Sequence, residues 1–407
     1  MDRKILNTTF SIYFMVNKVV LFIMDGLGDL KTPLTPLESA KKPNLNYLAQ
    51  HGMTGLLRPL GPGVTPTSDR SHLVLFGYDL EKDYCGRGPF EALGAGLKMK
   101  KGDVAFRANF ATMRNGIILD RRAGRINSAL AKKLSKEIPK KIGDVQVLFK
   151  STVEHRGALI LRRKNLSANI TDIDPKGNLH ILECESKDNS PRSKRTAEIV
   201  NKFIQIVHEK LNKNKLNKGR KLPANVILLR GAGKLKEAES FKKKFGMKAA
   251  CVAGGALYKG VAEYVGMDIL EVKGATGEKN TNLKAKGMAV LKALKKHEFV
   301  FLHVKATDSF SHDGDFEGKK KFIEKIDKEL VPLLIKSEAG LIITGDHTTP
   351  VSKKDHSFEP VPLLVYGIGR DGSKEFDESN CEKGKLWFVD GKELMNIALR
   401  IVGRGLF

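Results

Sequence analysis

The sequence contains aspartate and histidine residues that could bind metal ions. Asp346 and His347 stand side by side in the stretch TGDHTTP, directly after an apolar run. Asp308 and His312 are four residues apart, so on a helix their side chains would share one face. Carboxylate and imidazole groups together suit Zn²⁺ or Mn²⁺. The candidate ligands are Asp25, Asp308, His312, Asp346, His347 and His356.

Each of these residues alone is more typical of a polar turn or a surface group than of a metal site. Their joint occurrence favours a metal centre, because every member lies at an expected strand end or in a loop, where an open α/β sheet binds its ligands. The set is large enough for two ions. Two ions about 4 Å apart can hold the attacking and leaving oxygens of a phosphoryl transfer. The sequence therefore predicts a two-metal phosphotransfer centre.

A nucleophile for this chemistry could come from the stretch TPTSDRSHLVLFGYD. Its hydroxyl groups belong to Thr65, Thr67, Ser68 and Ser71, and residue type alone does not choose among them. At least one of them also fits the N-cap of a helix. A serine held by a metal ion would lose its proton more readily and could attack phosphorus without a general-base histidine.

Buried strands must bring these residues together. Three apolar runs each end in an aspartate, at Asp25, Asp308 and Asp346. Continuous apolar runs that alternate with helical patterns are typical of a parallel sheet covered on both faces. Because such sheets bind ligands beyond the carboxyl ends of their strands, the three aspartates should converge. We predict an α/β fold with a layered domain and a mostly parallel sheet.

The middle of the chain has a different pattern. From about residue 98 to residue 188, shorter alternating segments indicate an antiparallel or mixed sheet. A chain of 407 residues also exceeds the size that one hydrophobic core usually serves. We expect a discontinuous metal-binding domain of residues 1–97 and 245–407, interrupted by a smaller α+β substrate-binding domain of residues 98–244.

The composition is that of an ordinary globular protein, with 41% hydrophobic and 29% charged residues. The formal net charge of +25 could serve nucleic-acid binding. However, no aromatics interleave the basic stretch of residues 202–221, which favours a solvated lysine-rich surface. A positive field would also attract a small phosphorylated substrate. We expect neither a nucleic-acid nor a membrane partner, since no apolar run approaches the roughly 18 residues of a membrane span.

The cysteines and the N-terminus bear on location. Four cysteines lie far apart, without the spacing of a disulfide scaffold, which indicates a reducing cytoplasm. Residues 5–16 are mildly apolar but lack a signal-peptide cleavage pattern. We interpret the residues before Met15 as an upstream extension or a misassigned start. The sequence leaves open whether the protein forms a homo-oligomer.

A series of motifs extends in one order over nearly the whole chain. They are FIMDGLGD, TSDRSHLVLFGYD, YCGRGPFEALGAGL, FRANFAT, DRRAGRI, LLRGAG, ALYKGVAEYVGM, KATDSFSHDGD and TGDHTTP. This series resembles the archaeal-type cofactor-independent (2,3-bisphosphoglycerate-independent) phosphoglycerate mutases of the alkaline phosphatase superfamily. The resemblance implies an alkaline-phosphatase-like domain split around an inserted domain, with two divalent ions between.

The resemblance also implies a grouping of the ligands. One ion would be held by Asp25, Ser68, Asp346 and His347. The other ion would be held by Asp308, His312 and His356. Mn²⁺ is the expected metal, with Zn²⁺, Co²⁺ or Mg²⁺ as alternatives.

The implied reaction interconverts 3-phosphoglycerate and 2-phosphoglycerate, in glycolysis and gluconeogenesis, without a requirement for 2,3-bisphosphoglycerate. Ser68, in a context completed by Asp69 and His72, matches the serine that carries the phosphoryl group transiently. Lys259 matches the cation near the serine or the transferring phosphoryl group. The substrate would be a small phosphorylated carboxylic acid.

Arginines should hold the substrate's carboxylate, because the planar guanidinium matches a carboxylate with two hydrogen bonds. For each candidate, a structural ion pair is the alternative interpretation. The candidates are Arg230, Arg121, Arg125, Arg107, Arg156 and Arg87.

Other functions fit part of the pattern. Arg70 brings bulk and charge close to Ser68, where the family usually has small residues, so a paralogue with altered activity is one alternative. The metal ligands do not distinguish a mutase from a phosphomonoesterase or from a phosphomutase for another substrate, such as a pentose phosphate. In a different class, a basic nucleic-acid-binding protein with a degenerate metal site would also explain the charge.

Overall fold

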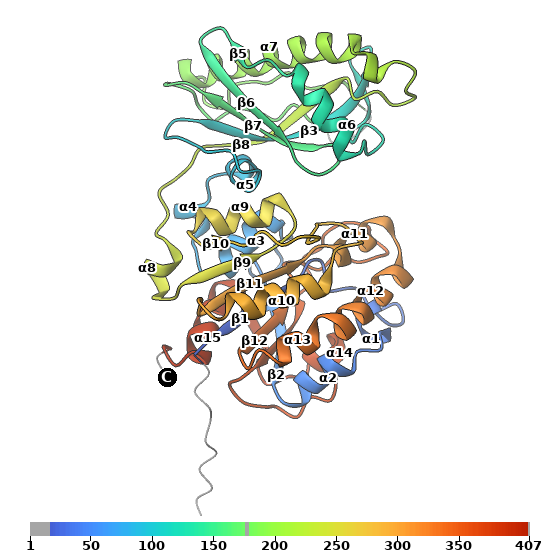
Figure 1. The fold of residues 1–407 in the computed structure, drawn as a ribbon, viewed down its shortest axis with the longest axis vertical. Helices are drawn as coiled ribbons and strands as arrows, with labels where there is room; N and C mark the ends of the chain where they lie inside the picture. The colour runs from blue at the N-terminus through green and yellow to red at the C-terminus, as the bar shows by residue number, and fades with distance from the viewer. Residues whose placement is uncertain (1–16, 176–178, 406–407) are drawn as a thin grey trace, which may run out of the picture.

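The computed structural model describes residues 17–175 and 179–405. The chain forms two β-sheets, one of eight strands and one of six. The sheets belong to two bodies, with helix α5 (Arg87–Gly94) between them (Figure 1). The predicted extension before Met15 lies outside the described residues. No described helix is both long and apolar enough to cross a membrane.

The larger sheet is mostly parallel, as predicted. Its spatial order is β10, β9, β11, β1, β12, β13, β2, β14, and only β13 runs antiparallel to its two neighbours. The strands are β1 (Val19–Met24), β2 (Met53–Arg58), β9 (Ala249–Val252), β10 (Asp268–Ile269), β11 (Phe299–Val304), β12 (Gly340–Thr344), β13 (Val361–Tyr366) and β14 (Phe388–Asp390).

Helices bury both faces of this sheet, which explains its continuous apolar runs. In β1, Val20 and Phe22 belong to one core cluster, whereas Leu21 and Ile23 belong to the other. The first cluster includes residues of α2 (Pro43–Gln50), α10 (Leu283–Ala293), α12 (Phe316–Glu329), α13 (Val331–Ile335) and α14 (Glu378–Cys381). The second includes residues of α3 (Ser68–Leu75), α8 (Phe241–Phe245), α9 (Ala256–Tyr264) and α15 (Leu394–Ile401). Further helices are α1 (Pro36–Ser39), α4 (Leu80–Asp83) and α11 (Ala306–Asp313).

The second sheet is antiparallel in all its pairings. It contains β3 (Val104–Arg114), β4 (Ile117–Asp120), β5 (Lys141–Ile142), β6 (Val145–Ser151), β7 (Arg156–Arg162) and β8 (Val226–Gly233). One face packs against α6 (Ser128–Leu134) and α7 (Pro191–Lys213). The predicted α/β fold with an inserted α+β part is therefore confirmed.

The exact domain limits stay a prediction. The strands of the second sheet lie between residues 104 and 233, within the predicted insert of residues 98–244. However, Phe241 of α8 packs on Phe299 of the larger sheet, with ring centroids 4.7 Å apart. The segment that ends the predicted insert therefore shares its core with the other body.

Two segments depart from their sequence patterns. The continuous helical pattern of residues 318–337 is split into α12 and α13, because Pro332 in the first turn of α13 lacks the N–H that would continue a helix. The alternating stretch of residues 177–185 suggested a strand, yet the described residues 179–185 contain only an isolated bridge, between His180 and Ile117.

The basic stretch of residues 202–221 belongs largely to α7, whose Phe203 and Val207 are buried while Lys202 and Lys210 are exposed.

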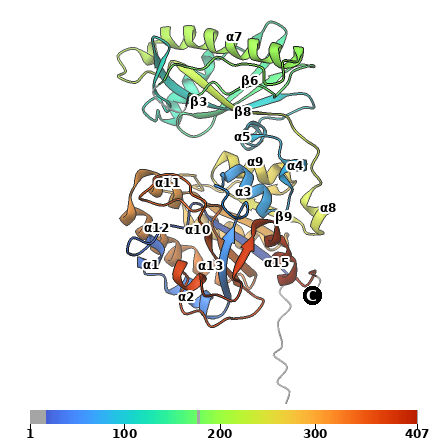
Figure 2. The same ribbon diagram turned by 180° about the vertical axis from the view of Figure 1, so that it is seen from behind.

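Helices α5 and α9 connect the two bodies through a close glycine contact. A Cβ atom on Gly94 of α5 would lie 1.7 Å from the carbonyl oxygen of Ala256, and one on Gly260 of α9 would lie 1.7 Å from that of Phe90. Only glycine permits this approach. Figure 2, which shows the molecule from behind, also has α5 between α9 and the second sheet.

We expect Gly94→Ala to destabilise the protein by about 1–3 kcal/mol, because the added methyl group forces two backbones apart. Chemical unfolding followed by circular dichroism would measure the change. Gly277→Ala is a matched control, since its Cβ would meet nothing closer than 3.5 Å. An unfolding midpoint equal to that of the wild type for Gly94→Ala would show that the contact is not tight in solution.

Candidate active site

The first ligand group lies where β1 and β12 end. These strands are parallel neighbours, with Ile23 opposite Thr344, so the residues that follow them emerge side by side. Asp25, Asp346 and His347 are fully buried, and one ligand atom from each lies within 4.8 Å of the others. The sheet register thus brings together residues more than 300 positions apart in the chain.

The second ligand group joins α11 to the loop after β12. Asp308 and His312 are one turn apart on α11, with Oδ2 and Nε2 separated by 3.4 Å. His356 Nε2 lies 3.6 Å from Asp308 Oδ1. The His356 ring also stacks on His347 at a centroid distance of 3.6 Å, so the two groups adjoin.

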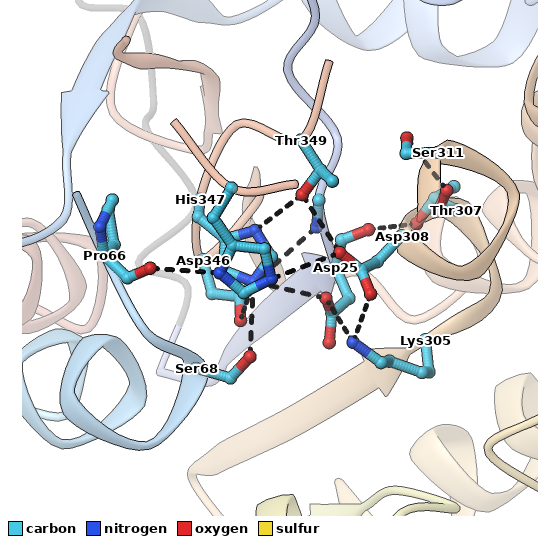
Figure 3. A network of polar contacts seen from close by, with 12 residues as sticks. Asp25, Pro66, Ser68, Lys305, Thr307, Asp308, Ser311, Asp346, His347 and Thr349 are labelled. Atoms are coloured by element: carbon cyan, nitrogen blue, oxygen red, sulfur yellow. Dashed lines mark hydrogen bonds and ion pairs between the residues drawn. The ribbon is translucent and has the colours of Figure 1, made fainter. Parts of the chain in front are cut away.

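Ser68 is the hydroxyl residue that reaches the first group. Its Oγ lies 3.2 Å from His347 Nε2 (Figure 3). Ser68 as a whole is 5% exposed. Ser68 opens α3, and His72 Nδ1 hydrogen-bonds to its carbonyl oxygen at 2.7 Å. By contrast, the hydroxyl of Thr67 bonds to Asp69, and that of Ser71 is buried without a hydrogen bond among the described residues.

Thr349 connects the two ligand groups, a role that sequence reasoning missed. Its hydroxyl donates to Asp308 Oδ1 at 3.0 Å and lies 2.9 Å from His347 Nδ1. Because the ionised carboxylate can only accept, the single hydroxyl proton points to Asp308. The threonine oxygen must then accept from Nδ1–H of His347. This tautomer makes Nε2 an acceptor, which faces the Ser68 hydroxyl and the carboxylates of the first ligand group.

The donor set fits a bound cation. The Nε2 lone pair of His347, which accepts from Ser68 Oγ–H, also lies 3.3 Å from Asp346 Oδ2 and 3.6 Å from Asp25 Oδ1, so acceptor atoms crowd one another. Asp346 Oδ2 is buried and accepts no hydrogen bond from a described residue. Burial and the neighbouring Asp25 raise the pKa of Asp346 well above its ordinary value. A divalent ion between these atoms would remove the repulsion.

Within the described part of the chain, Lys305 is the lysine that pairs with these carboxylates, and sequence reasoning also missed it. Its ammonium lies 3.0 Å from Asp25 Oδ1 and 2.6 Å from Asp308 Oδ2. Burial by itself lowers the pKa of Lys305. The two carboxylates outweigh this effect and raise the pKa well above its ordinary value. Lys259 lies elsewhere, with its ammonium 3.0 Å from both oxygens of Glu271.

Tyr258 and His303 also contact the carboxylate of Asp25. The hydroxyl of Tyr258 donates to Asp25 Oδ2 at 2.5 Å, and His303 Nε2 lies 3.0 Å from the same oxygen. Both are buried. Groups that hydrogen-bond to the remaining lone pairs of a metal ligand orient that ligand. Neither the tyrosine nor the histidine stands at a spacing from Asp25 that would reveal this contact in the sequence.

Arginines gather on the face of the second sheet that packs against α5. Ala105 and Ala158 cluster with Ala92 of α5, and the two-residue alternation of a strand puts Arg107 and Arg156 on that same face. Arg230 is the register partner of Arg107. Burial, followed by the charges of Arg87 and Arg230, lowers the pKa of Arg107 well below its ordinary value. This face thus presents concentrated positive charge.

All six candidate arginines already have carboxylate partners. Arg121 forms two 2.7 Å hydrogen bonds to Asp174, which Arg230 also approaches at 3.6 Å. Arg87 and Arg107 share Glu91, at 3.1 and 3.7 Å. Arg125 lies 3.4 Å from Asp313 of α11, across the two bodies, and Arg156 lies 3.9 Å from Glu154.

Arg122, which was not among the candidates, lies in the same arginine group. Burial and then the charges of Arg125 and Arg156 lower the pKa of Arg122. Its position directly after Arg121 in the motif DRRAGRI is the signal that could have identified it.

Comparisons with known proteins agree with these features. A family model described as 2,3-bisphosphoglycerate-independent phosphoglycerate mutase matches residues 49–217. The 2,3-bisphosphoglycerate-independent phosphoglycerate mutase 1 of Methanocaldococcus jannaschii is 45% identical to this chain over 401 residues. The match covers 95% of this chain and 98% of the relative. Its counterpart in Archaeoglobus fulgidus is 45% identical over 405 residues, covering 94% and 98%.

Solved structures extend the comparison. A cofactor-independent phosphoglycerate mutase from Thermoplasma acidophilum is 37% identical, with a TM-score of 0.67 and coverage of 95% of this chain and 100% of that one. A protein from Pyrococcus horikoshii is 36% identical, with a TM-score of 0.82 and coverage of 97% and 99%. The chain is thus an α/β enzyme of the phosphoglycerate mutase class. It belongs to the 2,3-bisphosphoglycerate-independent phosphoglycerate mutase family.

We expect Thr349→Val to weaken Mn²⁺ binding by about 10- to 100-fold, because the variant loses the hydroxyl that orients Asp308 and His347. Titration of chelator-stripped protein with Mn²⁺, followed by electron paramagnetic resonance, would measure the affinity. Thr349→Ser should restore it. Thr348→Val is the matched control, since that hydroxyl donates to the backbone oxygen of Pro360 rather than to a ligand residue of the described chain. Equal affinities for Thr349→Val and wild type would contradict the role given to Thr349.

Proposed function

We propose that this chain interconverts 3-phosphoglycerate and 2-phosphoglycerate through a phosphoserine at Ser68. Membership of the family supports the substrate. The observation that carries the mechanism is the contact of Ser68 Oγ with His347 Nε2, at 3.2 Å, inside a cluster of buried carboxylates. A hydroxyl in that position can be deprotonated and can attack phosphorus.

We infer two divalent ions, with Mn²⁺ favoured and Zn²⁺, Co²⁺ or Mg²⁺ as alternatives. The two ligand groups support two sites. One set would be Asp25, Ser68, Asp346 and His347. The other would be Asp308, His312 and His356. Bound ions would lower the pKa of the Ser68 hydroxyl and offset the charge of the phosphoryl oxygens.

The transfer needs no external phosphate donor. Ser68 Oγ attacks the phosphorus of the bound ester, so an Oγ–P bond forms as the P–O bond to the glycerate breaks. The glycerate oxygen gains the proton that the serine hydroxyl lost. Glycerate then reorients, and its other hydroxyl attacks phosphoserine in the reverse of the same chemistry. No 2,3-bisphosphoglycerate is consumed.

The protein can stabilise the phosphoserine with its own backbone. Ser68 is the first residue of α3, where the N–H groups of the first turn have no helical acceptors. These groups and the helix dipole favour an anion at this end. The Ser68 side chain is largely buried, which supports exclusion of the water that would otherwise hydrolyse the intermediate.

The arginine-bearing face of the second sheet is the proposed binding surface for the glycerate. Arg107 and Arg230 are register partners there, and a planar guanidinium suits a carboxylate. Arg156, Arg122, Arg125 and Arg87 border the same charge group. Arg121 forms two hydrogen bonds to one carboxylate, that of Asp174. Its role in substrate binding is therefore the least supported.

We place the reaction in the cytoplasm, because all four cysteines are free thiols and buried. The substrate is then a small phosphorylated carboxylic acid, and the lysine-rich surface serves solvation and attraction of anions rather than nucleic-acid binding.

Ser68→Ala should reduce kcat by at least about 10³-fold, because the variant lacks the group that accepts phosphate. The assay supplies 3-phosphoglycerate and Mn²⁺ without 2,3-bisphosphoglycerate and measures 2-phosphoglycerate and free phosphate separately. Mn²⁺ should still bind, since the other ligands remain. Ser71→Ala, on the same helix, should retain activity. Full activity of Ser68→Ala would refute the phosphoserine, and release of phosphate without 2-phosphoglycerate would favour a phosphomonoesterase.

Arg107→Gln should lower kcat/KM for 3-phosphoglycerate by about 10²-fold, because a desolvated charge-assisted bond to the substrate is lost. Steady-state kinetics at saturating Mn²⁺ would measure the loss, and Mn²⁺ affinity should not change. Arg162→Gln is the comparison, since Arg162 of the neighbouring β7 bonds to Asp103 instead. A kcat/KM within threefold of wild type for Arg107→Gln would remove Arg107 from the substrate site.

A further inference from the structure

Glu91 lies between two arginines at the contact of α5 with the second sheet. Its side chain is 9% exposed, and its Oε1 accepts a hydrogen bond from Nε of Arg87 at 3.1 Å. The same oxygen lies 3.7 Å from Nε of Arg107 on β3. One buried carboxylate oxygen therefore faces a guanidinium group from the helix and another from the sheet.

Glycine contacts fix the distance between α5 and the sheet. A Cβ atom on Gly88 would lie 2.0 Å from the carbonyl oxygen of Ala105. One on Gly233 of β8 would lie 2.1 Å from that of Cys85, just ahead of α5. The backbones thus meet without side chains between them. Because Glu91 stands on this helix, its carboxylate has a defined position relative to the sheet.

The contact with Glu91 leaves Arg107 able to bind a ligand. The distance of 3.7 Å exceeds that of a hydrogen bond, and Nε of Arg107 is buried without a hydrogen-bond partner among the described residues. Within the same described part of the chain, Glu91 is the carboxylate that forms an ion pair with Arg107. The carboxylate thus attracts Arg107 to one place without a hydrogen bond that a substrate would have to break.

Arg107 needs this counter-charge to stay among the other arginines. Burial, followed by the charges of neighbouring arginines, lowers the pKa of Arg107, and the charge of Glu91 acts in the opposite direction. Arg230, its register partner, forms an ion pair with Asp174 instead. Without Glu91, repulsion would favour conformations that move Arg107 away from the arginine-bearing face.

The ion pairs continue from Glu91 towards the proposed nucleophile. Nη1 of Arg87 lies 3.9 Å from Oδ1 of Asp69, the residue that follows Ser68 in α3. Asp69 also accepts a hydrogen bond from the hydroxyl of Tyr84 at 2.6 Å. A chain of paired charges thus extends from the first turn of α3, through α5, to β3.

We propose that Glu91 is a positioning residue that orients Arg107 for the carboxylate of the substrate. Through Arg87 and Asp69, it also fixes this arginine relative to Ser68. The inference rests on the proposed mutase function. A role in charge alone makes the opposite prediction, because a negative charge beside the binding surface repels an anionic substrate and its removal would tighten binding.

Two variants separate position from charge. Glu91→Gln removes the charge, whereas Glu91→Asp keeps the charge but withdraws it by one methylene group. Both should raise KM for 3-phosphoglycerate about 10-fold and change kcat by less than about threefold, because the carboxylate contact is weakened equally in the ground and transition states. Steady-state kinetics at saturating Mn²⁺ would measure both constants. Asp144→Asn is the matched control and should change neither constant, since Asp144 also pairs with two arginines, Arg163 at 2.6 Å and Arg195 at 3.1 Å.

A double variant, Glu91→Gln with Arg107→Gln, tests whether Glu91 acts through Arg107. Its kcat/KM should equal that of Arg107→Gln alone within about threefold, since a positioning residue has no effect once the group that it positions is gone. Losses that multiply in the double variant would overturn the proposal. A KM for Glu91→Gln equal to or below that of the wild type would also overturn it.

Chemical labelling tests the contacts of Glu91 without substrate. Phenylglyoxal attacks unprotonated guanidine groups. Burial lowers the pKa of Arg87, but nearby carboxylates, Glu91 first, outweigh this effect and raise it. In Glu91→Gln, phenylglyoxal should therefore modify Arg87 and Arg107 about threefold faster or more than in the wild type. Mass spectrometry of the peptides would measure the rates, with Arg162, which pairs elsewhere, as the internal control.

Equal labelling rates in Glu91→Gln and wild type would overturn the role given to Glu91. Because the labelling needs no substrate, it judges Glu91 even if the wild type forms no 2-phosphoglycerate. That last result would refute the proposed function instead.

Discussion

The structure depends on the crowding of three buried carboxylates at one end of a parallel sheet. Asp25, Asp308 and Asp346 are each at most 1% exposed, and charged groups in such a place are unfavourable unless they are compensated. Among the described residues, Lys305 supplies one ammonium, and burial lowers the pKa of the neighbouring imidazoles of His72 and His303. The raised pKa of Asp346 favours its protonation, and bound cations would supply the remaining compensation. A site that needs cations in this way is also prepared to accept the anionic oxygens of a phosphoryl group alongside them.

The fold tolerates this crowding because rigid elements hold each carboxylate. The backbone N–H of Asp25 donates to the carbonyl oxygen of Val304 at 3.0 Å, which extends the pairing of β1 and β11 by one residue. Lys319, buried in α12, lies 2.9 Å from Asp29 Oδ2 and 3.2 Å from the carbonyl oxygens of Gly28 and Thr349. Lys319 therefore links the loop after β1 to the loop after β12. A ligand group held to a few tenths of an ångström can bind metal with little reorganisation.

The apolar runs that end in aspartate predicted that the three aspartates converge. The resemblance to a known family predicted the grouping of the metal ligands and the choice of Ser68 as the nucleophile. Both rest on local signals: apolar runs that end in Asp, and a helix that spaces Asp308 and His312 by one turn. The compensating groups gave no such signal. Lys305 is one of many lysines in the chain, Thr349 is one of two adjacent threonines, and Tyr258 precedes the lysine that sequence reasoning preferred. Their roles arise from contacts with residues distant in sequence.

The sequence by itself determined the α/β class, the two-part organisation and the positions of the metal-capable residues, because hydrophobic periodicity and short-range spacing are properties of neighbouring residues. Only the tertiary structure decided which side chains meet. It brought Lys305 rather than Lys259 to the carboxylates, made Thr349 the link between His347 and Asp308, and engaged Arg121 with Asp174. The reason is physical: hydrogen bonds and ion pairs act over about 3 Å, and sheet register sets which distant residues come within that range.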